Sequence, residues 1–136
     1  MIGIDTNILA RVCLNDDPSD AAIAQQLLQQ LSSAKKLFIS SYAILEMAWV
    51  LKMKGRSRAE ITEIVLILLD SPGITLGQRE VITLALAHYR QGKADFGDYF
   101  ILAEGTLHGS HHLASFDQAL CKEQSRCQHP KHFFQA

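Results

Sequence analysis

Short apolar segments alternate with longer segments of helical periodicity, and this alternation constrains the fold more than any other feature of the sequence. Several of the apolar segments lead directly into Asp or Ser, residues that often begin helices. The pattern is typical of an α/β protein, with a short, mainly parallel central sheet flanked by helices. The expected strands are Met1 to Ile4, Leu37 to Ile39, Ile74 to Leu76 and His112 to Ser115, with a small edge strand around Phe133 and Phe134.

The composition is that of an ordinary globular protein. Of the 136 residues, 48% are hydrophobic and 20% are charged, and a chain of this length buries a substantial core. No linker or repeat divides it, so we expect a single domain over residues 1–136. Because the longest aliphatic run, Ile64 to Leu69, is too short for a membrane span and no signal peptide is visible, we expect no membrane association.

The cysteines indicate a reducing environment. An odd number of them, three, without a CxxC pair, argues against a disulfide framework and fits free thiols in the cytoplasm. Zinc-ligand residue types occur together near the end of the chain, but the gap between the two cysteines is a poor match to structural zinc sites. The alternative is a polar tail with scattered histidines. The residues concerned are Cys121, Cys127, His129 and His132.

The net charge does not by itself predict a nucleic-acid-binding protein. Thirteen basic residues against fourteen acidic ones give a formal charge of −1, so a polyanion would have to be attracted by a local basic patch or a bound metal. We interpret the densest basic segment as a patch that contacts phosphates, with a solvated turn between two helices as the alternative. This segment contains Lys52, Lys54, Arg56 and Arg58.

Glu46 is the acidic residue that most needs an explanation. It is the only charged residue between Tyr42 and Leu51, in a segment that is apolar almost all round, which predicts a buried helix. A lone buried carboxylate is costly unless it is paired, protonated or bound to a metal. Alternatively, Glu46 lies at the edge of the core and contacts water or an arginine.

Four aspartates occupy places where helices are expected to begin. Asp5 and Asp117 each follow an expected strand, at the sheet edge where ligands collect in parallel α/β proteins. Asp95 and Asp98 are three residues apart and therefore share one helical face. Helix capping is the alternative role, and it is a strong one for each residue taken alone.

Taken together, these carboxylates predict a metal site. Four separate segments bring carboxylates to one edge of the expected sheet, where like charges repel unless a cation neutralises them. Hard oxygen ligands of this kind suit Mg²⁺ or Mn²⁺. Such a cation can activate a water molecule and hold a phosphate, which is phosphodiester chemistry. The glycine-rich motifs of nucleotide-binding loops are absent from the sequence.

Four short motifs, in this order, make the chain similar to a PIN domain and, within that family, to a VapC-type toxin ribonuclease. The motifs are Ile-Asp-Thr-Asn-Ile-Leu at 4–9, Ser-Tyr-Ala-Ile-Leu-Glu-Met-Ala-Trp-Val-Leu at 41–51, Ala-Asp-Phe-Gly-Asp-Tyr-Phe-Ile-Leu-Ala at 94–103 and Ala-Ser-Phe-Asp at 114–117. The resemblance implies a three-layer sandwich and a Mg²⁺- or Mn²⁺-dependent endoribonuclease that cleaves RNA with a metal-activated water. It also implies a small antitoxin that covers the site, and a toxin homodimer.

The resemblance assigns roles to individual residues. Asp5 and Asp98 become the expected direct metal ligands, and Asp95 an accompanying acid. Tyr99 and Phe100 are larger than the residues usual after this aspartate, which predicts an altered substrate groove. The full implied set comprises the acids Asp5, Glu46, Asp98 and Asp117 and the supporting residues Thr6, Asn7 and Ser115.

Two other functions remain open at this stage. A PIN-like module could bind RNA or a protein without cutting, although such a module has no need for five acidic residues. A receiver-like signalling domain also binds Mg²⁺, but it needs an acidic pair just after the first strand, where this chain has Asp5, Thr6 and Asn7.

Overall fold

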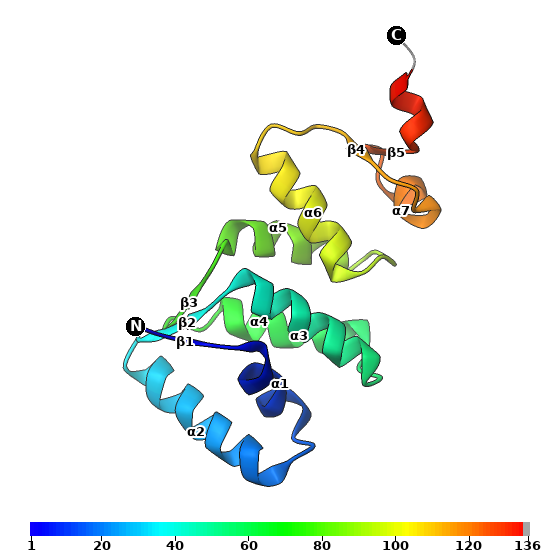
Figure 1. The fold of residues 1–136 in the computed structure, drawn as a ribbon. Helices are drawn as coiled ribbons and strands as arrows, with labels where there is room; N and C mark the ends of the chain where they lie inside the picture. Colours follow the sequence, from blue (N-terminus) through cyan, green and yellow to red (C-terminus); the bar gives the residue numbers. More distant parts are fainter. Residues whose placement is uncertain (135–136) are drawn as a thin grey trace. The chain divides into compact units, whose positions relative to one another are not determined.

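The structure is a computed structural model that describes residues 1–134, and the chain divides into two compact units (Figure 1). The first unit comprises residues 1–80 and the second begins at Val81. Seven α-helices and a short parallel sheet are present in the described residues. The predicted α/β class, with a short, mainly parallel sheet flanked by helices, is confirmed.

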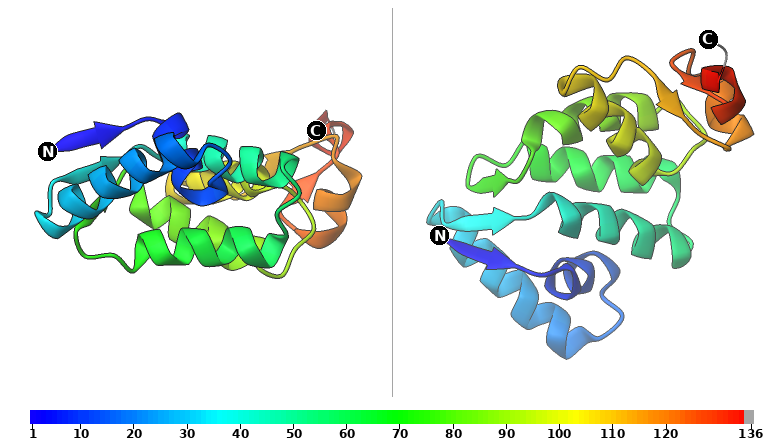
Figure 2. Two further views of the ribbon diagram at one scale, coloured as in Figure 1. Left: turned by 90° about the horizontal axis from the view of Figure 1, so that it is seen from below. Right: turned by 45° about the horizontal axis from the view of Figure 1, so that its top comes forward.

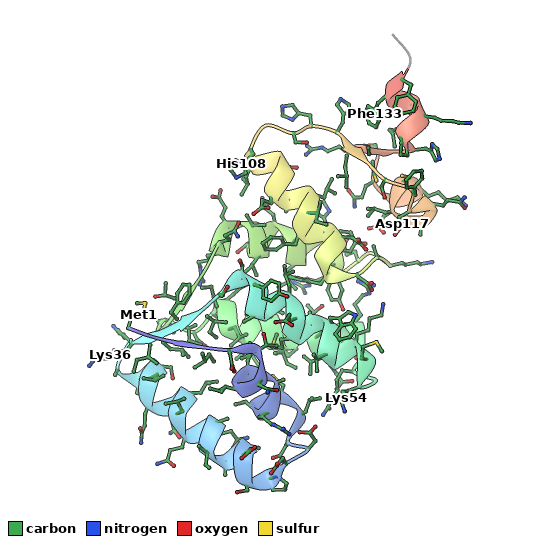
Figure 3. The ribbon with its side chains drawn as sticks, viewed as in Figure 1. Met1, Lys36, Lys54, His108, Asp117 and Phe133 are labelled. Atoms are coloured by element: carbon green, nitrogen blue, oxygen red, sulfur yellow. The ribbon has the colours of Figure 1, made fainter. Side chains whose placement is uncertain are left out.

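The first unit is built on a parallel sheet whose strand order is β1-β2-β3. Strands β1 and β2 begin side by side, next to Met1 and Lys36 (Figure 3), and each leads at its carboxyl end into a helix (Figure 2). This places the first residues of α1 and α3 at one edge of the sheet. The elements are β1 (Ile2–Ile4), α1 (Thr6–Leu14), α2 (Pro18–Ser33), β2 (Leu37–Ile39), α3 (Ser41–Met53), α4 (Arg58–Leu69) and β3 (Ile74–Leu76).

Local capping interactions determine where the helices of this unit begin. Ser40 caps α3 by accepting a hydrogen bond from the Tyr42 backbone N–H. Ser57 and Glu60 form a reciprocal capping box at the start of α4. Because these contacts span only two or three residues, they can be predicted from the sequence.

Helix α3 differs from the helix that the sequence predicts. Ile44 and Met47 are completely buried, but Tyr42 is 66% exposed and Trp49 is 60% exposed. The prediction of burial almost all round is therefore wrong, because only one face of α3 packs into the core. The opposite face carries aromatic side chains into the solvent.

The second unit contains α5 (Arg79–Tyr89), which begins just before the division, α6 (Phe96–Leu107) and α7 (Gln118–Glu123). The expected fourth strand is present as β4 (Leu113–Ala114), but it pairs in parallel with β5 (Cys127–Gln128) and not with the three-stranded sheet. The sequence does not predict β5, because a two-residue strand has no recognisable periodicity.

The predicted edge strand at Phe133 and Phe134 is wrong. These residues belong to a 3₁₀-helix, Pro130–Phe134. Proline suits the first turn of a helix because its missing N–H would have no partner there. In the part of the chain that the structure describes, no helix is long and apolar enough to cross a bilayer.

Candidate functional site

Asp5 lies where β1 ends and α1 begins, at the carboxyl edge of the parallel sheet. Its Oδ1 atom accepts a hydrogen bond of 3.0 Å from the Ile8 backbone N–H, so Asp5 is the N-cap of α1. The side chain is exposed. Capping does not exclude metal binding, because a carboxylate has two oxygens with about four acceptor sites.

Glu46 lies beside the start of α1, although it comes from α3. The Thr6 hydroxyl donates a hydrogen bond of 2.8 Å to Glu46 Oε1, across 40 positions of sequence. Glu46 is half-buried, so its position agrees with the edge location that we kept as the alternative. The hydrogen-bond donor that the structure gives Glu46 is Thr6, which the sequence alone does not indicate. Thr6 directly follows Asp5 in the chain, and we call Asp5, Thr6 and Glu46 the acidic cluster because they line the same cavity.

This cluster lies in an open cavity of about 490 Å³. Asp5, Thr6 and Glu46 line one part of it, and Asn7 continues the lining along α1. The cavity is large enough for part of a nucleotide chain. Among the described residues, its lining consists of Asp5, Thr6, Asn7, Ala10, Arg11, Leu14, Asp16, Glu46, Val50 and Lys54.

Sequence reasoning missed two charged residues of this cavity, Arg11 and Asp16. The Arg11 Nη1 atom lies 3.2 Å from Asp16 Oδ1, and both side chains are partly exposed. Helical periodicity carries a signal for Arg11, since it lies four residues after Asn7 and hence on the same face of α1. Asp16 has no comparable signal, because it follows the left-handed residue Asn15 after the helix ends.

The second unit holds the remaining predicted acids. Asp95 is the N-cap of α6, and Asp98 is the third residue of that helix. Asp98 Oδ2 accepts a hydrogen bond of 3.1 Å from the Asp95 backbone N–H. This confirms the expectation that Asp95 and Asp98 share the first turn of one helix.

Asp117 is the N-cap of α7, where Figure 3 labels it. Its Oδ1 atom accepts a hydrogen bond of 3.0 Å from the Leu120 N–H, and the Asp117 N–H donates to Ser115 Oγ at 3.0 Å. Ser115 thus orients the backbone that carries Asp117. Each predicted aspartate of the second unit is therefore held at the beginning of a helix.

The predicted metal ligands are carboxylates, whose hard oxygens suit a divalent cation such as Mg²⁺ or Mn²⁺. The first unit contributes Asp5 and Glu46, and the second contributes Asp98 and Asp117. Within residues 1–134, no three His, Cys, Asp or Glu side chains are gathered closely enough to hold a metal ion.

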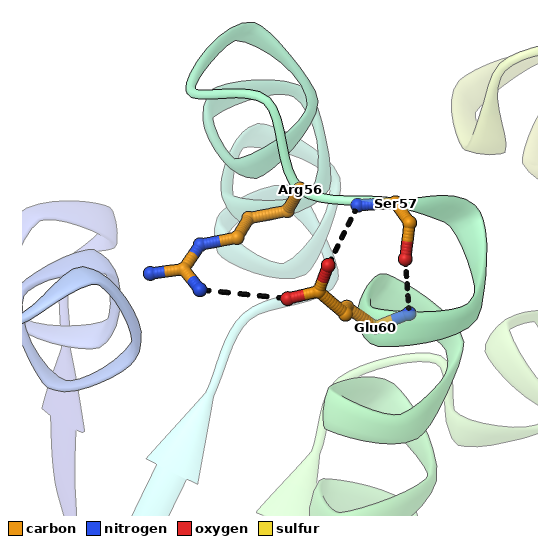
Figure 4. A network of polar contacts seen from close by, with 3 residues as sticks. All are labelled: Arg56, Ser57 and Glu60. Carbon is orange, nitrogen blue, oxygen red and sulfur yellow. Dashed lines mark hydrogen bonds and ion pairs between the residues drawn. The ribbon is translucent and has the colours of Figure 1, made fainter.

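The four predicted phosphate contacts of the basic turn do not have equivalent surroundings. Lys54 lies at the end of α3 (Figure 3), and it lines the cavity that contains Asp5 and Glu46. Arg56 Nη1 instead lies 3.4 Å from Glu60 Oε2, within the capping network of α4 (Figure 4).

The Glu60 carboxylate belongs to the helix cap and not to the cavity. Hydrogen bonds from Ser57, together with the neighbouring Arg56, lower the pKa of Glu60. Lys52 and Arg58 complete the basic turn but do not line the cavity. Lys54 is therefore the residue of this turn with the most direct access to the acidic cluster.

Tyr99 is completely buried, and Phe100 is buried beside it. The Tyr99 hydroxyl donates a hydrogen bond of 2.7 Å to Glu123 Oε1 and accepts one of 3.1 Å from the Ala94 N–H. The predicted effect of these large residues on a substrate groove finds no support here, because both side chains belong to the core of the second unit. Tyr99 instead holds the segment that leads into Asp95.

Tyr99→Phe is expected to lower the free energy of unfolding by about 1–3 kcal/mol, because it removes a hydrogen bond to a carboxylate and one to a backbone N–H. Chemical denaturation of both proteins measures the difference. Tyr42→Phe is the matched control, since Tyr42 is exposed and should change stability by less than about 0.5 kcal/mol. Equal stability of Tyr99→Phe and the parent would contradict the role of the Tyr99 hydroxyl in holding the segment that leads into Asp95.

The zinc site considered near the end of the chain does not form in the described residues. Cys121 and Cys127 lie together, with their sulfurs 3.3 Å apart, but the histidines contact aromatic rings. His129 meets Phe116, and His132 meets Phe133. All three cysteines are free thiols, as predicted.

One comparison with known proteins identifies a family. The model of the family described as "PIN domain" matches residues 2–123, which include the acidic residues of both units. Neither the curated proteins nor the solved structures contain a significant match to this chain.

Proposed function

The chain belongs to the PIN-domain family, a superfamily of nucleases, and from this premise we propose that it is a Mg²⁺- or Mn²⁺-dependent endoribonuclease. The observation that carries the proposal is that Asp5 and Glu46, two predicted acidic residues from distant segments, line one open cavity, where Thr6 donates a hydrogen bond to Glu46. The family model crosses the division between the two units, which supports a single nuclease domain.

In this proposal the cation is held by Asp5, Glu46, Asp98 and Asp117, with Asp95 assisting. When bound, it supplies charge neutralisation and an activated water for phosphodiester hydrolysis. Thr6 orients the Glu46 carboxylate through its hydroxyl, and Asn7 and Ser115 support the acids next to them in sequence. Lys54 contacts the phosphates of the substrate.

A non-catalytic RNA- or protein-binding module is the second candidate. The experiment that separates the two is incubation of purified, partner-free protein with total RNA, with Mg²⁺ or Mn²⁺ or with a chelator. We expect RNA fragments only when the cation is present, and none from Asp98→Asn. Binding of RNA without any cleavage under all conditions would favour the module.

We further propose that the protein is the toxin of a type II toxin–antitoxin pair in the cytoplasm. In this proposal a small antitoxin inhibits it by covering the acids, for which a basic side chain is well suited, since arginine can bridge carboxylates. A short reading frame next to the gene would support this role.

The toxin is expected to be a homodimer. The exposed apolar residues Tyr42, Trp49 and Met53 lie on α3, and exposed apolar side chains of this size are common at protein interfaces. Light scattering at tens of micromolar should therefore give twice the mass of the chain. A strict monomer under these conditions would contradict the dimer.

Changing Lys54 and Arg56 together to Gln is expected to weaken RNA binding by a catalytically inactive variant. The logarithmic salt dependence of the affinity should flatten by about one unit or slightly more, because each lost contact to single-stranded RNA removes about 0.7. Titrations at several salt concentrations measure this slope. Because Arg56 pairs with Glu60, Lys54→Gln alone should account for the larger part of the change in salt dependence.

The cleavage position should not change in the double variant, since phosphate contacts carry no base recognition. Lys36→Gln is the matched control, because Lys36 directly precedes β2 and does not line the cavity. If affinity and slope in the double variant equal those of the parent, the basic segment is a solvated turn.

A further inference from the structure

The cavity beside Asp5 and Glu46 is lined by charges of both signs. Asp5, Glu46 and Asp16 contribute negative charge, and Arg11 and Lys54 contribute positive charge. Binding of a cation by the acidic cluster does not by itself require an arginine in this cavity. An RNA strand, however, brings a phosphate for each nucleotide, and arginine binds phosphate through paired N–H donors.

The placement of Arg11 suits such a contact. It lies on the same face of α1 as Asn7, in the helix that Asp5 caps. Arg11 contacts Asp16 through its Nη1 atom. Because a guanidinium has five N–H donors in all, other donors can bind a phosphate. Because both side chains are partly exposed, the ion pair is weak and exchanges readily.

We propose that Arg11 is a phosphate-positioning residue of this cavity and that Asp16 competes with the RNA phosphate for its guanidinium. This inference rests on the proposed nuclease function and adds a residue to it. Without RNA, Asp16 neutralises Arg11 and keeps it away from the acidic cluster. With RNA, a phosphate takes the place of Asp16 and is held beside Asp5 and Glu46.

The test uses two substitutions that break the same ion pair. In the Asp98→Asn background, Arg11→Gln should weaken binding of a single-stranded RNA oligonucleotide by roughly five- to tenfold and reduce the salt slope by about 0.7. Asp16→Asn should instead strengthen binding by up to about fivefold, because the competitor is removed. Fluorescence anisotropy measures both, and Arg90→Gln, at an exposed arginine outside the cavity, should change neither.

The opposite signs separate this role from a structural one. If the ion pair only stabilised the fold, both substitutions would lower the melting temperature alike and neither would strengthen binding. Binding that is unchanged or changed in the same direction by both would overturn the role of Arg11. An Asp98→Asn parent that binds no RNA at low salt would overturn the proposed function together with this inference.

A second observation, independent of the nuclease function, concerns the thiols of the second unit. Cys121 lies on α7 and Cys127 on β5, and their sulfurs are 3.3 Å apart. Cys127 is completely buried, whereas Cys121 is partly exposed. Burial, together with the neighbouring Cys121, raises the pKa of Cys127 to about 11.

We infer that Cys121 and Cys127 are an oxidisable pair that forms an intramolecular disulfide with a small-molecule disulfide as the oxidant. The Cys121 thiolate attacks the oxidant, and one small thiol leaves. The Cys127 sulfur, losing its proton, then attacks the Cys121 sulfur and displaces the second small thiol. Two protein thiols and one small disulfide thus become one protein disulfide and two small thiols.

Oxidised glutathione is the probe, and intact-mass spectrometry is the measurement. The wild-type chain should lose the mass of two hydrogen atoms, and dithiothreitol should restore it. Cys121→Ala should lose no such mass, whereas Cys13→Ala should behave as wild type, because Cys13 is in the first unit and contacts Met47. Two glutathione adducts on wild type, or no reaction of Cys121, would overturn the pairing.

Discussion

Asp98→Asn is expected to reduce RNA cleavage by on the order of a hundredfold or more, as is usual when a charged group that stabilises a transition state is removed. Asp98 is in the first turn of α6, and its carboxylate accepts from the Asp95 N–H. The amide of Asn also has an oxygen that accepts this bond, but it lacks the negative charge that holds a cation. The protein should therefore stay folded and lose activity.

The same outcome is expected for Asp5→Asn and Asp117→Asn. Both residues are N-caps whose Oδ1 accepts a backbone hydrogen bond, and Asn is as good an N-cap as Asp. The substitution thus separates the capping role from the charge. Without metal, these variants should be at least as stable as wild type, because repulsion between carboxylates decreases.

Asp17→Asn is the matched control for these variants. Asp17 caps α2 in the same manner, by accepting from the Asp20 N–H, but it lies outside the predicted acidic set. It should keep full activity. Cleavage rates measured on one RNA under one Mn²⁺ concentration compare the four variants directly. Full activity of both Asp5→Asn and Asp98→Asn would contradict the proposed mechanism.

Mn²⁺ is expected to raise the melting temperature of wild type by several degrees and that of Asp98→Asn by clearly less. A ligand that binds only the folded state adds about 2.7 kcal/mol of stability when its free concentration is 100 times its dissociation constant. Loss of one carboxylate weakens the binding and hence the gain. Thermal unfolding monitored by circular dichroism, with and without Mn²⁺, measures both shifts.

Asp17→Asn is also the control for the thermal unfolding experiment with Mn²⁺. Asp17→Asn should show the full wild-type shift, since its carboxylate is not an expected ligand. Equal shifts in wild type and Asp98→Asn would mean that Mn²⁺ stabilises the protein from another site. Because the measurement does not depend on turnover, it tests the metal site separately from the nuclease activity.

Much of the fold was predictable because it depends on short-range interactions. The capping box of Ser57 and Glu60 spans three residues, and Asp5 caps a helix that begins at the next residue. The three strands of the parallel sheet are short apolar segments with clear boundaries. Burial around α3 was not predictable, because a helix that is apolar almost all round does not indicate which side faces the solvent.

The candidate site was predictable only in part, because its contacts also join segments that are distant in the sequence. The motifs indicate the family and predict a set of acidic residues, but the hydrogen-bond donor to Glu46 is Thr6, 40 positions away. Arg11 and Asp16 become neighbours through the left-handed turn at Asn15, which no periodicity predicts. In the basic turn, Lys54 lines the cavity, whereas Arg56 pairs with Glu60. Which basic residue Glu60 contacts likewise cannot be predicted from the sequence.

The sequence by itself determined several helix caps and the strands of the parallel sheet, because each follows from residues that are close in the chain. Only the tertiary structure decided the pairing of β4 with β5, the proximity of Cys121 to Cys127 and the mixed charges around Asp5 and Glu46. These depend on packing between segments that are distant in sequence or joined by irregular turns, and local propensity does not encode such distances.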